Sequence, residues 1–312
     1  MEKQNHSMMS EFILLGLTES RELQIFFFLI FTIIYIAIVL GNLIIIFMVK
    51  MDPLLHSPMY FLLANLSFYD MSLASFATPK MIYDLINDYK IISYQGCMTQ
   101  MFFLHLLGGS EMMLLVAMAI DRYIAICKPL HYRNIVSNHV CIGLVLGSWS
   151  TGFVHTISQM VYTVTLPFCG PNVVDSFFCD LPQVIKLACT DTDILEFLVI
   201  AESGLLSLLC FILLFISYCI ILITVQHRSS RGSSKALSTL SAHITVVMVF
   251  FGPCIFIYVW PFSSISIDKI LSVFYTVFTP LLNPIIYTFR NKDMKKALQN
   301  LKSMLVQDQS FN

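Results

Sequence analysis

The chain has 312 residues, of which 57 % are hydrophobic and only 12 % are charged, and its formal net charge is −1. Soluble domains are usually about one quarter charged, so this composition excludes an ordinary soluble protein and predicts that most of the chain contacts lipid. No basic tract of the kind that binds nucleic acid is present, so a nucleic-acid partner is not expected.

Seven runs of the sequence are apolar and long enough to cross a bilayer, which takes about 20 residues of helix. They are Gln24–Val49, Pro58–Thr78, Gly96–Ile120, Val140–Val161, Phe197–Val225, Ala242–Trp260 and Ile270–Phe289. The fourth run is the least clearly bounded, because no charged residue falls between Arg133 and Asp175. We therefore expect an all-α membrane protein, a seven-transmembrane helix bundle.

The basic residues predict the orientation of this bundle. If the N-terminus lies outside and the C-terminus inside, 12 of the Lys and Arg residues lie on the inner side and 6 on the outer side. This excess on the inner side is what the positive-inside rule predicts. Residues 1–22 lack the apolar core and cleavage site of a signal peptide, so we interpret Gln24–Val49 as a signal anchor. The predicted parts are an extracellular N-terminus (1–23), the transmembrane domain (24–290) and a cytoplasmic tail (291–312). In the tail, Asn291–Val306 is amphipathic and predicts a short eighth helix on the inner leaflet.

Two asparagines near the start of the chain suggest different roles. Asn5 begins a glycosylation sequon, Asn5-His6-Ser7, on the predicted outer side. Asn42 lies in the middle of the first run. A buried amide in hydrocarbon needs a partner, so we expect Asn42 to form a hydrogen bond to another helix.

Two acids, Asp70 and Glu111, lie within the second and third runs. A lone carboxylate is costly at that depth, so the two groups should share a proton or hold a cation between them. One alternative is a bound sodium ion, completed by the amides of Asn42 and Asn283. The other is a protonated, hydrogen-bonded pair without an ion. No other cofactor is expected.

Nine cysteines divide into two groups by their predicted side of the membrane. Five lie near the cytoplasmic edge (Cys127 and Cys141) or within the apolar runs (Cys210, Cys219 and Cys254) and are expected to be reduced. The other four lie on the outer, oxidising side, where disulfides persist: Cys97, Cys169, Cys179 and Cys189. Four cysteines allow three pairings, among which the spacing does not choose, and the spacing does not indicate zinc.

The later runs contain prolines that should bend their helices. Gly252-Pro253 predicts a hinge in the sixth run. In the seventh, the pattern Asn283-Pro284-x-x-Tyr287 combines a proline with an amide and a hydroxyl group. We expect Asn283 to satisfy backbone groups that Pro284 frees. The third run is followed by Asp121-Arg122-Tyr123, an acid, a base and an aromatic at the predicted inner edge of the membrane.

Several motifs together resemble the odorant receptor branch of the rhodopsin-like G-protein-coupled receptors. They are Phe12–Thr18, Pro58–Asp70, Met118–Tyr132, Phe177–Asp180, Ser217-Tyr218, Lys235–His243 and Pro280–Asn291. The resemblance extends over essentially the whole chain, in order and spacing. Leu237 and Leu240 stand where the family usually has an aromatic residue and a cysteine, and both changes are conservative.

The resemblance implies a function and a mechanism. The implied pairing of cysteines is Cys97–Cys179 and Cys169–Cys189, and Asp70 and Glu111 match a sodium pocket. The implied receptor binds a small odorant and activates a heterotrimeric G protein of the stimulatory olfactory type, which raises cAMP. It lies in the cell membrane of sensory cilia, contacts membrane lipid and is not an enzyme. Residues that match the coupling switch are Asp121, Arg122, Tyr123, Tyr218, His243, Asn283, Pro284 and Tyr287.

A ligand pocket is expected in the outer half of the bundle, between the third, fifth, sixth and seventh helices. Its predicted lining is His105, Gly108, Gly109, Met112, Glu202, Leu206, Phe251, Cys254, Ile255, Tyr258, Val273 and Thr276. Three alternatives stay open. The two glycines either leave room for ligand or allow close helix packing. His105 either contacts ligand or bonds the outer loop, and Glu202 either selects a polar or amine ligand or extends outward.

Other functions would use some of the same residues. A receptor for a non-odorant molecule outside the nose would have the same sequence features. An ion-coupled transporter or channel would also use buried acids, but no inverted repeat is visible. A membrane enzyme would need a catalytic group of residues, and His139, His155 and His243 are scattered without metal-ligand spacing.

Overall fold

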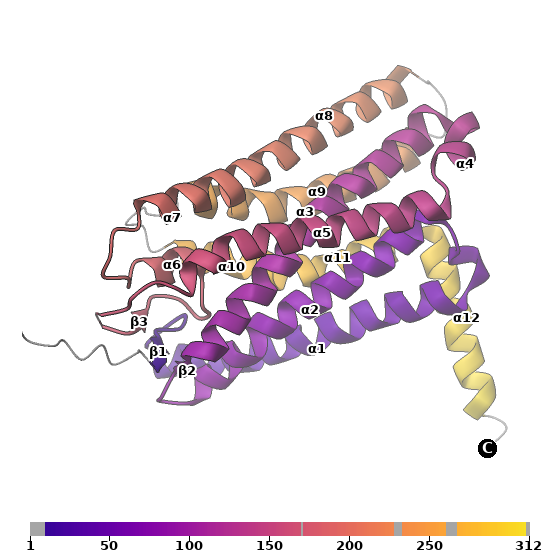
Figure 1. Cartoon of the computed structure of the whole chain (residues 1–312). Helices are drawn as coiled ribbons and strands as arrows, with labels where there is room; N and C mark the ends of the chain where they lie inside the picture. Colours follow the sequence, from indigo (N-terminus) through magenta and orange to yellow (C-terminus); the bar gives the residue numbers. More distant parts are fainter. Residues whose placement is uncertain (1–9, 170, 228–232, 260–266, 310–312) are drawn as a thin grey trace, which may run out of the picture.

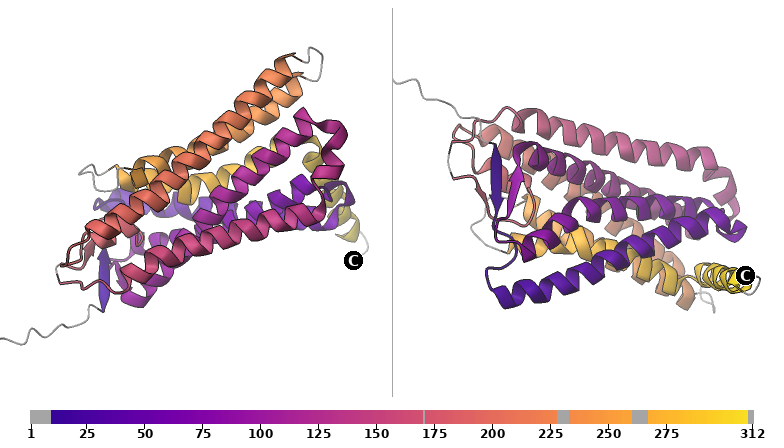
Figure 2. Two further views of the ribbon diagram at one scale, coloured as in Figure 1. Left: turned by 45° about the horizontal axis from the view of Figure 1, so that its top comes forward. Right: turned by 90° about the horizontal axis from the view of Figure 1, so that it is seen from below.

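The computed structural model describes residues 10–169, 171–227, 233–259 and 267–309, and in a few helical stretches, among them 233–240 and 302–309, it describes the backbone alone. Long helices run side by side along one axis (Figure 1). Three short strands gather at one end of this bundle, and the helices α4 and α12 lie at the other end (Figure 2). The predicted sequon at Asn5 and the side chain of His243 lie outside the described residues.

Each predicted apolar run coincides with a continuous helical segment over its described residues. These segments are α1 (Arg21–Met51), α2 (Pro58–Ile86), α3 (Tyr94–Cys127), α5 (Asn138–Thr163), α7–η3–α8 (Asp193–Leu198, Val199–Gly204, Leu205–His227), α9 (Ser233–Val259) and α10–η4–α11 (Asp268–Val273, Phe274–Phe278, Thr279–Arg290). Both η3 and η4 are π-helical turns. The shorter elements are η1 (Pro53–Leu55), η2 (Pro129–His131), α4 (Tyr132–Ile135), α6 (Leu181–Ile185) and α12 (Lys292–Gln309).

Five helices of the described chain are long and apolar enough to span a membrane: Arg21–Met51, Tyr94–Cys127, Asn138–Thr163, Asp193–Val225 and Asp268–Thr288. A shorter apolar helix covers Ile244–Val259. The helix α2 is not among them, because polar residues such as Asn65, Asp70 and Ser75 interrupt its apolar sequence. The fold is therefore a helical membrane bundle, and the number of spans remains a prediction.

The bundle carries apolar side chains on its outside and polar side chains within. Ile33 and Val154 are 68 % and 67 % exposed. Asn42, Asp70 and Glu111, in contrast, are fully buried. An apolar exterior of this extent would aggregate in water, so the distribution agrees with a lipid environment.

The amide of Asn42 joins α1 to α11 at a proline. Pro284 prevents the normal helical hydrogen bond to the carbonyl of Pro280, four residues earlier. Asn42 Nδ2 donates to that carbonyl at 3.1 Å, and the ring of Pro284 packs against Gly41. The predicted helix–helix bond of Asn42 is thus confirmed. The prediction that Asn283 satisfies the freed backbone was wrong: Asn42 does so from the neighbouring helix, which leaves Asn283 free to bond Asp70.

The helices α3 and α5 cross closely because small residues lie at the contact. A Cβ atom added to Gly152 would lie 2.2 Å from Ser110 Oγ and 2.5 Å from the Leu106 carbonyl oxygen. Gly109 approaches Gly152 from the other side, with its ideal Cβ position 3.3 Å from the Gly152 Cα. Small residues allow such close backbone approach in membrane bundles.

A small sheet and two disulfides organise the end opposite α12, and the sequence had not predicted the sheet. Strand β1 (Glu11–Leu14) pairs antiparallel with β2 (Ile91–Ser93) and parallel with β3 (Val173–Val174). Disulfides join Cys97 to Cys179 and Cys169 to Cys189, the pairing that the resemblance implied. The other five cysteines form no disulfide.

The amphipathic segment after α11 forms the helix α12, which lies across the end of the bundle (Figures 1 and 2). Its apolar side is anchored by Met294 and Ala297, both buried. At its start, the Tyr60 hydroxyl bonds Asn291 Oδ1 and Asp293 Oδ2, each at 3.1 Å. Contact of α12 with the inner leaflet remains a prediction.

The α3–α5 crossing predicts a sharp difference between two glycine substitutions on α5. Gly152→Ala should destabilise the protein by about 1–3 kcal/mol, because the new methyl group meets backbone atoms that cannot rotate away. Gly147→Ala is the control, because a Cβ atom there has no neighbour within 4 Å. Thermal denaturation midpoints of the purified proteins in detergent measure the difference. Equal midpoints for the two variants would contradict the packing described here.

Candidate ligand pocket and cytoplasmic switch

Two of the predicted pocket residues meet inside the bundle, His105 from α3 and Tyr258 from α9. Both are buried, and their ring centres are 6.2 Å apart. His105 Nδ1 lies 2.9 Å from the Met101 carbonyl oxygen, whereas Nε2 is buried without a hydrogen-bond partner. His105 therefore bonds its own helix rather than the outer loop, and its second nitrogen can serve a ligand.

The two neighbouring glycines of α3 have different surroundings. A Cβ atom on Gly108 would meet nothing within 4 Å, so this position leaves space. Gly109 faces α5, where its ideal Cβ position is 3.3 Å from Gly152 and 3.4 Å from His155 Nδ1. Gly109 thus takes the close-packing alternative, and only Gly108 keeps a place in the predicted pocket.

The other predicted lining residues divide between the bundle interior and its surface. Ser207 donates to Met112 Sδ at 3.5 Å, and the rings of Phe211 and Phe251 are 6.3 Å apart. Within the interior, four further predicted residues are buried or half-buried: Cys254, Ile255, Val273 and Thr276. Glu202 and Leu206 line a groove between α5 and α8 at the bundle surface. Glu202 thus takes the outward alternative, and a contact of either residue with a ligand in the pocket stays a prediction.

One acidic residue near this cluster was missed, because it comes from a loop. Asp180 follows Cys179, and the disulfide to Cys97 fixes the loop to the start of α3. The Tyr258 hydroxyl points to Asp180 Oδ1 at 3.5 Å. Burial, with a smaller contribution from nearby Asp268, raises the pKa of Asp180 to about 7. The sequence did contain a clue: Asp180 directly follows Cys179, and a disulfide from that cysteine to the third helix would hold Asp180 near the bundle.

The two buried acids lie where α2, α3 and α11 meet. Asn283 Nδ2 donates to both carboxylate oxygens of Asp70, at 3.0 Å and 2.8 Å. Glu111 is close enough to Asp70 for the two acids to interact electrostatically. Among the described residues, Glu111 Oε1 and Oε2 and Asn283 Oδ1 are buried without a hydrogen-bond partner, as are Asn42 Oδ1 on α1 and Ser67 Oγ on α2. Carboxylate, amide and hydroxyl oxygens are the ligands that hard cations take, so these residues fit a sodium ion.

Four of the predicted switch residues come together at the end of the bundle that carries α12: Asp121, Arg122, Tyr218 and Tyr287. Asn283 instead lies deeper in the bundle, at Asp70. Arg122 Nη2 lies 3.3 Å from Asp121 Oδ2, and the Tyr132 hydroxyl donates to Asp121 Oδ1 at 2.7 Å. Tyr218 and Tyr287 are buried and close enough to Arg122 to interact with its charge. Three helices therefore meet at the arginine.

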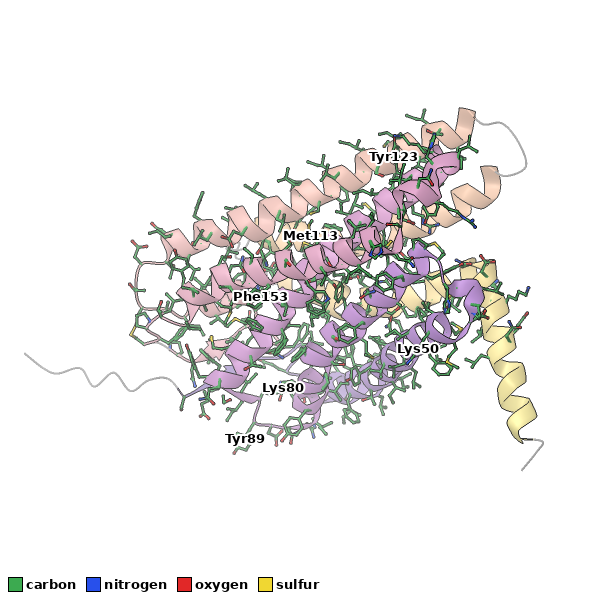
Figure 3. All side chains as sticks on the ribbon, turned by 45° about the vertical axis from the view of Figure 1, so that its right-hand side comes forward. Lys50, Lys80, Tyr89, Met113, Tyr123 and Phe153 are labelled. Atoms are coloured by element: carbon green, nitrogen blue, oxygen red, sulfur yellow. A yellow bond between two sulfur atoms is a disulfide. The ribbon has the colours of Figure 1, made fainter. Side chains whose placement is uncertain are left out.

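Figure 3 shows how the two ends of the bundle differ. Lys80 and Tyr89 lie toward the end with the strands, whereas Lys50 and Tyr123 lie toward the end with α12 (Figure 3). Tyr123, the third residue of the predicted triplet, is half-buried. The Asp121–Arg122 pair is next to it in α3, so the switch and the Asp180 loop lie at opposite ends of the bundle.

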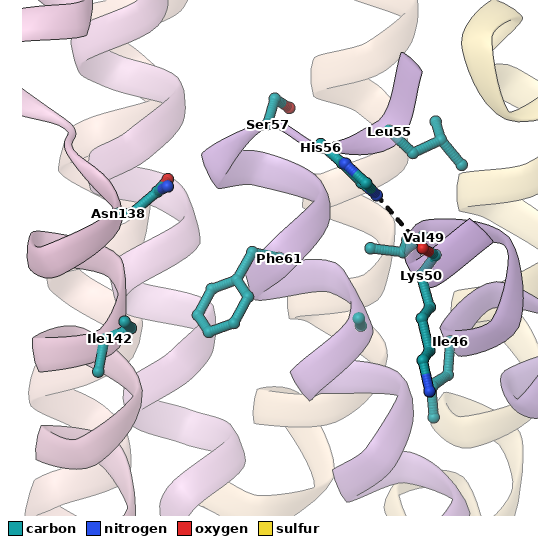
Figure 4. Close-up of a pocket in the computed structure, with 10 residues that line it drawn as sticks. Ile46, Val49, Lys50, Leu55, His56, Ser57, Phe61, Asn138 and Ile142 are labelled. Atoms are coloured by element: carbon teal, nitrogen blue, oxygen red, sulfur yellow. Dashed lines mark hydrogen bonds between the residues drawn. The ribbon is translucent and has the colours of Figure 1, made fainter. Parts of the chain in front are cut away.

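A separate hollow of about 510 Å³ lies near the switch end, between α1, α2 and α5 (Figure 4). Its lining includes Lys50, Phe61 and Ile142, and His56 Nε2 lies 3.3 Å from the Lys50 carbonyl oxygen. It contains none of the predicted ligand residues, so it does not belong to the predicted pocket.

A profile of the olfactory receptor family matches residues 31–307, which include nearly all of the helical bundle. The chain belongs to the olfactory receptor family. Human olfactory receptor 4K13 is 68 % identical over 96 % of this chain and 98 % of its own length. Human olfactory receptor 4K3 is 66 % identical over 96 % and 95 %, and human olfactory receptor 4K15 is 63 % identical over 97 % and 94 %.

Membership of the olfactory receptor family decides several questions that the sequence left open. The family consists of G-protein-coupled receptors, not enzymes, so the membrane-enzyme alternative is removed. The chain is thus a multi-pass membrane protein of a kind that takes a small-molecule ligand and couples to a G protein. The buried His105–Tyr258 cluster and the Arg122 cluster are the candidate sites for these two roles.

The raised pKa of Asp180 predicts a pH dependence of stability. An acid with a pKa of about 7 in the folded protein and 3.8 ordinarily holds its proton more tightly after folding. Its contribution to stability is therefore greatest below about pH 4 and falls as the pH rises to about 7, by at most about 1.4 kcal/mol per pH unit. In the Asp180→Asn protein, the thermal denaturation midpoint should fall less between pH 5 and pH 7.5 than in the wild type. Asp88→Asn, an exposed loop acid, is the control. An unchanged slope in the Asp180 variant would contradict the assignment.

Proposed function

We propose that this chain is a seven-transmembrane odorant receptor with its N-terminus outside the cell and its C-terminus inside. It binds a small, volatile, apolar or weakly polar ligand in the outer half of the bundle. It then activates a heterotrimeric G protein of the stimulatory olfactory type and raises cAMP. We place it in the cell membrane of sensory cilia, with 1–23 outside, 24–290 in the membrane and 291–312 in the cytoplasm.

The observation that carries this proposal is the separation of two buried clusters along one bundle. At one end, Tyr258 and His105 lie beneath the loop that Cys97–Cys179 holds in place. At the other end, Arg122 is paired with Asp121 and lies near Tyr218 and Tyr287. A ligand at the first cluster can influence a G protein at the second only by shifting how the helices between them pack.

The chemistry of the outer cluster supports a small ligand with at most a few polar groups. Aromatic and aliphatic side chains dominate it, and the Tyr258 hydroxyl and His105 Nε2 supply hydrogen bonds. Ligand pockets with this composition take apolar molecules and orient them through a few polar contacts. Gly108, three residues after His105, has no atom within 4 Å of its ideal Cβ position, so a ligand could contact α3 there.

The inner cluster supports an exchange of partners as the coupling step. The Arg122–Asp121 pair and the Tyr132–Asp121 bond hold the inner end of α3 in one arrangement. Movement of the inner half of α9 about Pro253 would allow Arg122 to leave Asp121 for Tyr218 and the G protein. The amphipathic α12 would lie on the inner leaflet beside this surface.

A sodium ion between Asp70 and Glu111 belongs to the same proposal. The unpartnered oxygens around these acids support it, whereas a protonated Asp70–Glu111 pair is the alternative. If sodium is bound in the resting receptor, replacing extracellular sodium with N-methyl-D-glucamine should raise ligand potency, and Asp70→Asn should remove that effect. A response that is independent of sodium would favour the protonated pair.

A cAMP reporter screen against a broad odorant panel tests the proposed function. Arg122→Ala should reduce every ligand response at least tenfold, whereas Lys50→Ala, at the same end in α1 but not among the Arg122 contacts described above, should not. Tyr258→Phe removes one hydroxyl and should lower potency about tenfold for ligands that use it. Tyr83→Phe, exposed on α2, is its control.

Two outcomes of the screen would overturn parts of the proposal. Responses that Tyr258→Phe leaves intact for every ligand would contradict the pocket. Asp70-dependent ion flux without any ligand-dependent cAMP would favour the transporter alternative. A ligand that is not an odorant would favour a chemosensory receptor outside the nose with the same site.

A further inference from the structure

Glu202 lies away from the bundle interior, in the π-helical turn η3. Its carboxylate accepts a hydrogen bond from the Ser158 hydroxyl of α5. The next residue, Ser203, also contacts α5, with Gln159 Nε2 and His155 Nε2 at 2.7 Å and 3.0 Å from its hydroxyl. The wide π turn, which interrupts the regular helical repeat, aims both consecutive side chains at the same neighbouring helix.

Gly204 shows that the opposite side of this turn is closed. A Cβ atom on Gly204 would lie 2.5 Å from the Tyr258 carbonyl oxygen, so η3 packs directly on the backbone of α9. Glu202 is half-buried, and the exposed part of its side chain therefore faces the outside of the bundle.

The carboxylate of Glu202 is at the edge of a groove of about 650 Å³ between α5 and the η3–α8 segment. Its walls include Val154, Leu205 and Leu209, which are 67 %, 49 % and 59 % exposed. These exposed aliphatic residues belong to the apolar outer surface, so the groove opens toward lipid. His155, Ser158 and Glu202 supply its polar surface.

Glu202 needs a partner that the described part of the chain does not provide. Among the ion pairs formed by described residues, none includes Glu202. It lies about 9 Å along the helix from Glu196, toward the membrane interior. A carboxylate facing hydrocarbon is costly unless a cation or several donors accompany it, and Ser158 supplies one donor.

We propose that this groove is a second ligand site, which binds a lipophilic ammonium compound from within the bilayer. The ammonium group pairs with Glu202, and the alkyl chain lies against Val154, Leu205 and Leu209. An uncharged lipid tail would fill the same volume but would leave the carboxylate unpaired, so charge complementarity selects the amine. The site is distinct from the odorant pocket at His105 and Tyr258.

The site is connected to the proposed odorant pocket by the same helical turn. Ser203 contacts His155, and the ring of His155 stacks on His105 of the pocket with ring centres 6.1 Å apart. On its other side, Gly204 packs against the backbone of Tyr258. Occupancy of the groove should therefore modulate the odorant response without replacing the odorant.

Photolabelling tests the proposal without a G protein or an odorant. The purified full chain in phosphatidylcholine nanodiscs is exposed to a twelve-carbon alkyl amine that carries a diazirine, and labelled peptides are identified by mass spectrometry. The amine should label the segments 150–158 and 199–209. The alcohol with the same chain and diazirine should label them at least tenfold less.

Substitutions distinguish the ion pair from general lipid contact. Glu202→Gln keeps the Ser158 bond and should reduce amine labelling at least tenfold, to the level of the alcohol. Glu196→Gln is the matched control, because this acid of the same helix accepts from Thr192 at 2.8 Å outside the groove. Should Glu202→Gln fail to fold, Val154→Trp, which fills the groove from its lipid side, should block labelling instead.

Three results would overturn the proposal: equal labelling by amine and alcohol, undiminished labelling of the folded Glu202→Gln protein, or an equal loss in the Glu196 control. Failure of these tests leaves the proposed odorant response to be judged by the separate cAMP screen.

Discussion

Hydrocarbon offers no hydrogen bonds, so the polar side chains inside this bundle depend on the protein for partners, and the partners that join helices fix how the helices pack. Asn42 bonds the carbonyl that Pro284 leaves free, and Asn283 bonds both oxygens of Asp70. These contacts join α1 and α2 to α11 around the buried Glu111. They also explain why α11 can contain a proline in its middle: a neighbouring helix supplies the donor that the missing backbone bond requires.

The same constraint separates the two ends of the receptor. At the strand end, a disulfide holds Asp180 against Tyr258, and burial raises the pKa of that carboxyl group to about 7. At the other end, Asp121 is satisfied by Arg122 and Tyr132. Between them lies the Asp70–Asn283 link. In the proposed mechanism, a change of packing at one end reaches the other through these polar contacts, because they are more directional than the surrounding apolar contacts.

The sequence predicted the extent of the helices well, because hydropathy and length are properties of each segment alone. It also predicted the polar groups that need partners, but it did not predict which partners they find. Asn283 bonds Asp70 rather than freed backbone, and Gly109 packs on α5. The sequence left the direction of Glu202 undecided, because a π turn changes which side of a helix a residue faces and periodicity does not reveal such a turn. The strands were missed because their partners are distant in sequence.

The most direct test of the central claim is GDP release from a purified stimulatory olfactory-type heterotrimer, with the purified receptor in nanodiscs and an activating ligand from the panel. The wild-type receptor should accelerate release at least tenfold when ligand is added. Asn283→Ala, which breaks the link to Asp70, should bind the ligand and lose this acceleration. Asn65→Ala removes an amide that bonds only its own helix and should behave as wild type. A response of the Asn283 variant equal to that of the wild type, or no acceleration by the folded wild-type receptor, would contradict the account.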